Sequence, residues 1–266
     1  MFKFQSKIKT KETEFFHRLM TRVERDEALY DRAEALLSGA AKAEPLIEET
    51  LRTPQDIRYH AEGPFVHDHL RLMLMSLYAI EEGKLHLLEI EELARMKGYE
   101  HEIETLEYTM REHASWFEAF VLVHDSAKWN SIIFQSPEGS RGAELGFNLK
   151  LIYEPDVDIV HRSSLRERYL DLYRDFVAQH SNESAREVQS LFYLAYEIDV
   201  KYPHHDRMIH APVYTLLLQR FATAHELTNI HSAMLEDLVS RHLRFKQFSA
   251  APFFHLARNR GYDGDD

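Results

Sequence analysis

The sequence predicts an all-α fold with one main core, and three observations lead to this prediction. The 266 residues include 9 glycines and 8 prolines. That is about half of average usage and leaves little material for the turns of a fold with many short strands. Hydrophobic residues make up 44% of the chain and aromatic residues 12%, which is enough to build a core. Apolar residues also recur at helical spacing along most of the chain.

The N-terminal part of the chain predicts a helical hairpin. Residues 11–50 are rich in Glu, Leu and Ala, and breaks at Ser38–Gly39 and at Pro45 suit two amphipathic helices that pair. Prolines and a glycine in the stretch 53–64 then predict a loop.

Two later helices each bring a histidine to an apolar face. In the helix expected from about residue 65 to 82, His69 begins a mainly apolar stripe that should face inward. In the helix expected over 102–128, the apolar run Ala119–Val123 leads directly into His124–Asp125. A buried histidine needs a polar partner, so both positions are candidates for a site.

The second half of the chain predicts a loop-rich connection followed by more helices. Residues 134–165 hold most of the central glycines and prolines, with one short helix expected near 144–151. Further helices are expected over about 165–179, 183–201, 212–224 and 231–244. The expected parts are a helical segment 1–52 packed on the core, a helical domain 53–258 and a flexible tail 259–266.

Charge and cysteine content exclude several classes of function. The formal net charge of −12 disfavours binding to the phosphate backbone of nucleic acids. The absence of cysteine excludes disulfides, thiolate zinc sites, iron–sulfur clusters and cysteine nucleophiles, so any metal must be held by His, Asp or Glu. No segment approaches the ~18 apolar residues of a membrane span, and the N-terminus lacks the apolar core of a signal peptide. We therefore expect a soluble, cytoplasmic protein without a membrane partner.

Three His-Asp dipeptides occur, and their context separates them. They lie at His67–Asp68, His124–Asp125 and His205–Asp206. Only His124–Asp125 ends an apolar helix, where both side chains can leave the core at a pocket floor. A divalent cation needs three or four ligands from separate elements, and His69 is a suitable further ligand. The alternative for His124–Asp125 is an ion pair or a cap at the end of a helix.

These stretches resemble the HD-domain superfamily of metal-dependent phosphohydrolases. Its pattern is a lone His, then a His-Asp pair, then a remote Asp, on an all-helical fold. The matching stretches are EGPFVHDH at Glu62–His69, VLVHDSAK at Val121–Lys128 and LAYEID at Leu194–Asp199. The similarity covers about residues 56–215.

The resemblance implies an HD-like helical core, extended by the N-terminal hairpin and the C-terminal helices. It also implies a divalent metal ion (Mn, Mg, Co, Zn, Ni or Fe) and a small phosphorylated substrate such as a nucleotide. The implied metal ligands are His69, His124, Asp125 and Asp199. Asp206 is a rival for the remote carboxylate, and Asp199 is preferred because it would share a helical face with Phe192 and Ala195.

Four further residues are candidates for substrate or supporting roles. Lys128 and Arg141 could orient a phosphate, and the alternative for each is a cation in solvent. His60 and Glu62 could support the ligands or contact the substrate, and the alternative is an exposed pair in a loop.

One departure from the family pattern bears on the number of metals. Relatives with two metals add a loop motif of the form GHxxxGA, whereas residues 139–144 read GSRGAE and contain no histidine. This argues against an HD-type di-iron oxygenase, the second enzyme hypothesis. A third hypothesis is a binding or regulatory module that has lost turnover.

Other known site motifs do not account for this chain. The sequence has no His-Glu-x-x-His, phosphate-binding P-loop or Gly-x-Ser-x-Gly motif, and only Glu14–His17 fits the Glu-x-x-His pattern of ferritin-like sites.

Overall fold

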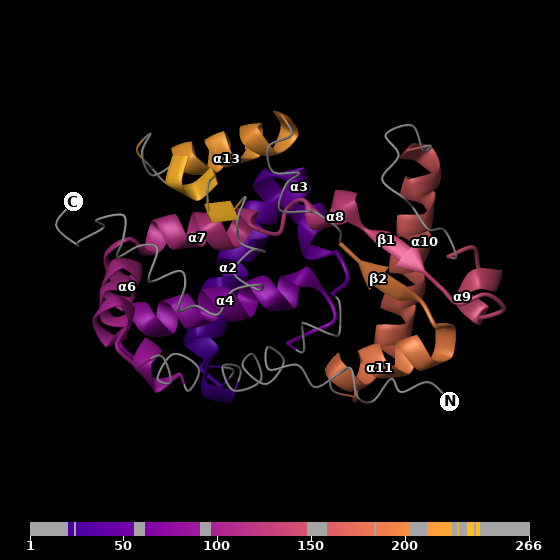
Figure 1. Ribbon diagram of the computed structural model, residues 1–266, viewed down its shortest axis with the longest axis horizontal. Helices are drawn as coiled ribbons and strands as arrows, with labels where there is room; N and C mark the ends of the chain where they lie inside the picture. The colour runs from indigo at the N-terminus through magenta and orange to yellow at the C-terminus, as the bar shows by residue number, and fades with distance from the viewer. Residues whose placement is uncertain are drawn as a thin grey trace. The chain divides into compact units, whose positions relative to one another are not determined.

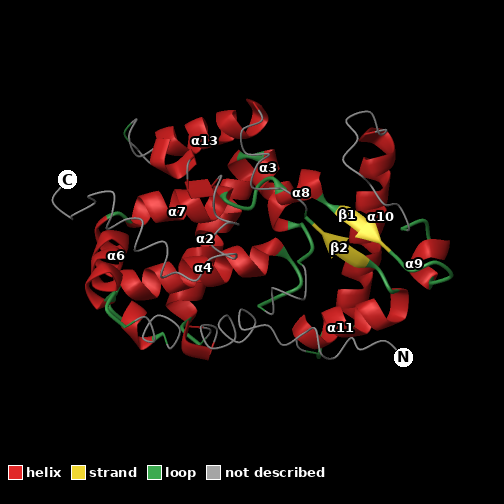
Figure 2. Ribbon diagram, viewed as in Figure 1, coloured by secondary structure: helices red, strands yellow, loops and turns green. Residues whose placement is uncertain are grey.

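The computed structural model describes most of the chain between residues 21 and 239. The described residues are 21–23, 25–55, 62–90, 97–147, 159–183, 185–202, 212–224, 228, 233–236 and 238–239. They are mostly helical, with two short strands (Figures 1 and 2). The predicted helical character is therefore confirmed, and the two short strands are an addition that the sequence did not predict.

The chain divides into two compact units, each assembled from separate stretches of sequence. Among the described residues, the first unit takes 41–55, 62–69, 128–147, 159–183 and 185–202. The second takes 21–23, 25–40, 70–90, 97–127 and the described residues from 212 onward. The expected parts 1–52, 53–258 and 259–266 stay predictions.

The first unit surrounds a largely aromatic core. Its elements are α3 (Pro45–Leu51), the start of α4 (Val66–Glu81), α8 (Lys128–Ser131), β1 (Ile133–Gln135), α9 (Arg141–Glu144), α10 (Ile159–Gln179), α11 (Ala185–Tyr196) and β2 (Asp199–Lys201). Buried residues of β1, β2, α10 and α11 form one cluster, in which Tyr169, Tyr173 and Phe192 pack at centroid distances of 4.8–5.7 Å. Aromatic packing thus fixes the long helix α10 against the strands.

The two strands form a small antiparallel sheet that the sequence pattern did not predict. Phe134 pairs with Val200 at its centre, and both side chains are buried. The helix expected over 183–201 ends instead at Tyr196, because Glu197 adopts a left-handed backbone conformation with φ of 54°. The β-branched residues Ile198 and Val200 follow it and favour a strand. Asp199 therefore lies in β2, and the helical-face argument that preferred it as a ligand is wrong.

The second unit consists of α2 (Glu27–Ala43) up to residue 40, α4 from Leu70, η1 (Leu87–Glu89), α6 (Glu100–Glu112), α7 (Ala114–Val123) and α13 (Pro212–Ala224). Helix α6 packs against η1 and α7, and α7 packs against α13 (Figure 1). Two expected boundaries differ. Helix α2 continues through Ser38–Gly39, and the helix expected over 102–128 is interrupted at His113. Within the described ranges, no helix has the length and apolar character needed to cross a bilayer.

Candidate metal centre

The first turn of α4 is built around a glycine that precedes it. A Cβ atom on Gly63 would lie closer than 3.0 Å to the side chain of Asp68, so only glycine fits there. The Asp68 carboxylate accepts a hydrogen bond from the backbone N–H of Phe65 at 3.1 Å, which caps the start of the helix. The Gly63 carbonyl accepts a hydrogen bond from Gln189 Nε2 at 2.8 Å. These contacts fix the entry into α4 and thereby the position of His69, one turn into the helix.

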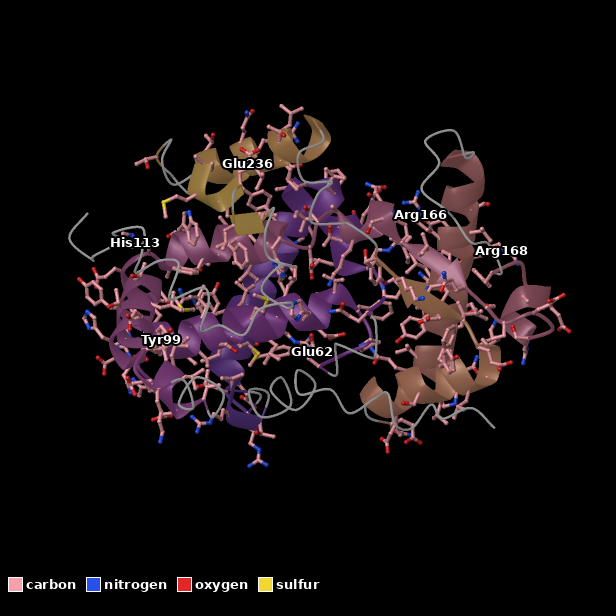
Figure 3. All side chains as sticks on the ribbon, in the orientation of Figure 1. Glu62, Tyr99, His113, Arg166, Arg168 and Glu236 are labelled. Atoms are coloured by element: carbon pink, nitrogen blue, oxygen red, sulfur yellow. The ribbon has the colours of Figure 1, made fainter. Side chains whose placement is uncertain are left out.

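His69 is buried and has a carboxylate partner. Its Nδ1 atom lies 2.6 Å from Oε1 of Glu62, and the two residues are 6% and 5% exposed (Glu62 is labelled in Figure 3). An ionised carboxylate can only accept, so Nδ1 donates and Nε2 carries the lone pair. A carboxylate behind a histidine is the usual support of a metal ligand, because it fixes the tautomer and the ring orientation.

His124 is oriented in the same way by the backbone. It caps the C-terminus of α7, and its Nδ1 atom lies 2.9 Å from the carbonyl oxygen of Val121. A carbonyl can only accept, so Nδ1 again donates and leaves Nε2 as the acceptor atom. The ring also stacks on Phe120 with centroids 5.1 Å apart. Nε2 of His124 lies 3.5 Å from Oδ2 of Asp125, which is 2% exposed.

His69, His124 and Asp125 form a buried group that could hold a metal ion. Each offers one ligand atom, and these atoms lie within 4.8 Å of one another. Ligand atoms about 2.0–2.2 Å from a cation lie up to ~4 Å from one another, so the group is close to coordination distances. The chemistry suits a divalent cation, because two neutral imidazoles and one carboxylate leave room for a further ligand.

The expected remote carboxylate is not part of this group as far as the structure describes it. Asp199 is half-buried at the start of β2, with Oδ2 3.6 Å from Nζ of Lys201. Asp206 lies outside the described residues. The choice between Asp199 and Asp206 therefore stays a prediction.

The four supporting candidates occupy different environments. Glu62 is buried beside His69, so the alternative of an exposed loop residue does not hold for it. Lys128 is 4% exposed, which excludes the alternative of a lysine in solvent. Arg141 is exposed, with its guanidinium 4.8 Å from the ring centre of Tyr196, and its phosphate role stays a prediction. His60 lies outside the described residues.

Two residues near Lys128, Gln55 and Arg166, could not be singled out from the sequence pattern. Gln55 Oε1 lies 3.5 Å from Nζ of Lys128 and is surrounded in sequence by ordinary loop residues. Arg166 of α10, labelled in Figure 3, is 9% exposed and donates to the Trp129 carbonyl and to Asn130 Oδ1, both at 3.0 Å. Arg166 thereby ties α8, the helix that begins at Lys128, to α10.

Comparisons with models of protein families, with curated proteins and with solved structures found no match to the chain. Functional inference therefore depends on the geometry and chemistry of the site itself.

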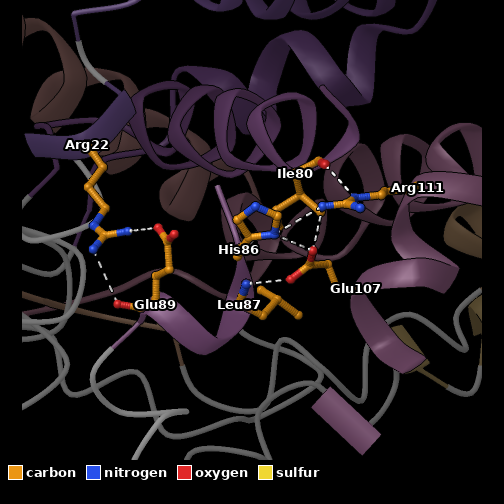
Figure 4. A network of polar contacts seen from close by, with 7 residues as sticks. All are labelled: Arg22, Ile80, His86, Leu87, Glu89, Glu107 and Arg111. Carbon is orange, nitrogen blue, oxygen red and sulfur yellow. Dashed lines mark hydrogen bonds and ion pairs between the residues drawn. The ribbon is translucent and has the colours of Figure 1, made fainter. Parts of the chain in front are cut away.

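The second unit also contains a network of ionisable groups around Glu107 (Figure 4). Glu107 accepts hydrogen bonds from Leu87 N–H at 2.7 Å and from Nδ1 of His86 at 2.9 Å, and it pairs with Arg111 at 2.5 Å. Arg111 also donates to the carbonyl of Ile80 at 2.9 Å. Burial by itself would raise the pKa of Glu107, but the hydrogen bonds from His86 and Leu87 and the charge of Arg111 outweigh it and lower that pKa. The network joins α6 to the segment that follows α4.

Proposed function

We propose that the protein is a metal-dependent phosphohydrolase that cleaves a phosphate ester bond in a nucleotide or another small phosphorylated molecule. One observation carries this proposal. His69 and His124 are buried with Nδ1 hydrogen-bonded, which leaves Nε2 as the acceptor atom. The ligand atoms of these two histidines and of the buried Asp125 lie within 4.8 Å of one another. Burying two imidazoles and a carboxylate together costs free energy, because each polar group is desolvated, and a bound cation would offset part of that cost. The resemblance of these stretches to the HD-domain superfamily supports the same reaction class.

Each residue of the group has a definite part in this function. Nε2 of His69, Nε2 of His124 and a carboxylate oxygen of Asp125 would hold a divalent metal, with Asp199 or Asp206 as the remote ligand. Such an ion lowers the pKa of a bound water and stabilises negative charge on phosphoryl oxygens. Glu62 and the Val121 carbonyl keep the imidazoles in the ligating tautomer.

A buried cationic side chain, that of Lys128, follows Asp125 by three residues in sequence. Its buried ammonium suits an anionic oxygen of the substrate, since charge-assisted hydrogen bonds are the strong ones in a site of low dielectric constant. Hydrolysis adds water across the bond between phosphorus and the ester oxygen, releasing phosphate and an alcohol.

Elemental analysis of the purified protein, combined with a phosphatase screen, tests the proposal. The screen covers nucleotides and simple phosphate esters, with and without added manganese, magnesium or cobalt. We expect bound metal and metal-dependent release of phosphate. Metal binding without turnover of any phosphate ester would favour the alternative of a binding or regulatory module, and a folded protein that binds no metal would contradict the site itself.

A further inference from the structure

The side chain of Gln55 has a fixed orientation and one unused donor. An ammonium group can only donate, so the amide oxygen of Gln55 must face Lys128, and it does so at 3.5 Å. The amide nitrogen Nε2 then points elsewhere. Gln55 is only 3% exposed, and its Nε2 atom is buried without a hydrogen-bond partner among the described residues. A buried donor without a partner is unfavourable, because no hydrogen bond offsets its loss of hydration.

The backbone around Gln55 is held rigidly next to the helix that carries His69. Gln55 N–H donates to the Pro64 carbonyl at 2.9 Å, and Val66 N–H donates to the Thr53 carbonyl at 2.8 Å. Tyr202 adds a further tie, because its hydroxyl donates to the carbonyl of Pro54. These bonds fix the backbone from which the Gln55 side chain extends.

Lys128 is kept close to Asp125 by the short stretch of chain between them, and its own position is fixed by packing. It lies three residues after Asp125, so the two Cα atoms are at most about 11 Å apart. Its ammonium lies 5.8 Å from the ring centre of Tyr202, and its helix α8 is tied to α10 by Arg166. A buried amide N–H₂ and a buried ammonium, both rigidly placed, form a pair of donors that suits an anionic oxygen.

We propose that Gln55 is a substrate-positioning residue whose amide nitrogen, together with the Lys128 ammonium, binds a non-reacting oxygen of the substrate's phosphoryl group. This inference rests on the proposed function. It assigns to Gln55 a part in the affinity of the site for the phosphoryl group of the substrate. Gln55 has two tasks: its Oε1 orients the ammonium of Lys128, and its Nε2 supplies the second hydrogen bond.

Binding of inorganic phosphate, measured by isothermal titration calorimetry on the metal-loaded protein, tests this inference. Gln55→Glu keeps an oxygen toward Lys128 but replaces the N–H₂ donor with an acceptor, and Gln55→Met removes both groups at similar size. We expect each variant to weaken phosphate binding at least about tenfold, with metal content unchanged. The matched control is Gln135→Glu, because Gln135 Oε1 accepts from Lys201 Nζ at 2.6 Å and forms a lysine–glutamine pair in β1 and β2.

The outcomes separate this inference from the proposed function. Phosphate binding of wild-type strength in a folded, metal-loaded Gln55 variant would overturn the inference while leaving the metal centre intact. Absence of phosphate binding in the metal-loaded wild type would overturn it as well. If the wild type binds no metal but binds phosphate in a Gln55-dependent manner, the inference stands and the proposed function fails.

Discussion

His69 and Glu62 form a buried pair in which imidazole Nδ1 lies 2.6 Å from carboxylate Oε1. In this pair Nε2 of His69 remains as the acceptor atom. Gly63 and the start of α4, which fix the positions of Glu62 and His69, lie between the two residues in sequence. A candidate metal ligand and the carboxylate that supports it therefore lie in one continuous stretch of eight residues, Glu62–His69.

Removing the carboxylate behind His69 should weaken metal binding without removing a ligand. Glu62→Leu is expected to lower metal affinity by about 10- to 100-fold, because the imidazole loses its fixed tautomer and orientation. Glu62→Gln keeps an acceptor oxygen and should lose less. Titration with manganese or zinc measures the effect, and equal affinities in the wild type and Glu62→Leu would show that Glu62 does not support a ligand.

Adding a methyl group at Gly63 should destabilise the first unit. In Gly63→Ala the new Cβ would overlap Asp68, the residue that caps α4, and we expect a loss of about 1–3 kcal/mol in unfolding free energy. Gly39→Ala is the matched control. Gly39 lies inside α2, where an added Cβ atom would have no described neighbour within 4 Å, so alanine there should stabilise the helix by about 0.5–1 kcal/mol. Urea unfolding of both variants checks the opposite signs.

The remote carboxylate can be assigned by comparing two variants. Asp199→Asn and Asp206→Asn each keep side-chain size while removing the charge, and the variant that removes a ligand should lose metal affinity. Because Asp199 lies in β2 beside Lys201, its replacement should otherwise affect mainly that pair. Competition with a chromogenic chelator measures the affinities. Undiminished affinity in both variants would show that neither residue is the fourth ligand.

The Glu107 network should make stability depend on pH on the acidic side. The pKa of Glu107 is lowered in the folded protein from its ordinary value of 4.5, so the folded state favours the ionised carboxylate. Its stabilisation is therefore fully present above the pKa of the unfolded chain and is lost as the pH falls through the lower, folded value. Glu107→Gln should cost about 1–2 kcal/mol at neutral pH, and its difference from the wild type should shrink in acid.

Glu104→Gln supplies the control for that experiment. Glu104 lies on the same helix α6 with an exposed side chain. Thermal unfolding followed from neutral to acidic pH should give a nearly constant difference for this variant. A Glu107→Gln difference that stays equally constant across the range would contradict the pH dependence.

Helical periodicity predicted the parts of the site that depend on local pattern. The apolar stripe beginning at His69 indicated that this histidine is buried in α4, and the apolar run before His124 indicated that α7 ends there. Both residues lie where the spacing placed them because one buried face determines the orientation of an amphipathic helix.

Features that depend on contacts distant in sequence could not be predicted in this way. Whether β2 forms is decided by pairing with β1, more than sixty residues earlier, and by the left-handed conformation of Glu197. Gln55 contacts Lys128 across 73 residues of sequence, and its neighbours carry no pattern that singles it out. Helical spacing carries no information about such pairs, because it reports only neighbours on the same helix.

The metal content of purified protein tests the central claim most directly. Wild type and His101→Ala, which changes an exposed histidine of α6, should each bind about one equivalent of divalent metal per chain, whereas His124→Ala and Asp125→Ala should bind far less while remaining folded by circular dichroism. Equal metal content in all four proteins would contradict a metal centre at His69, His124 and Asp125.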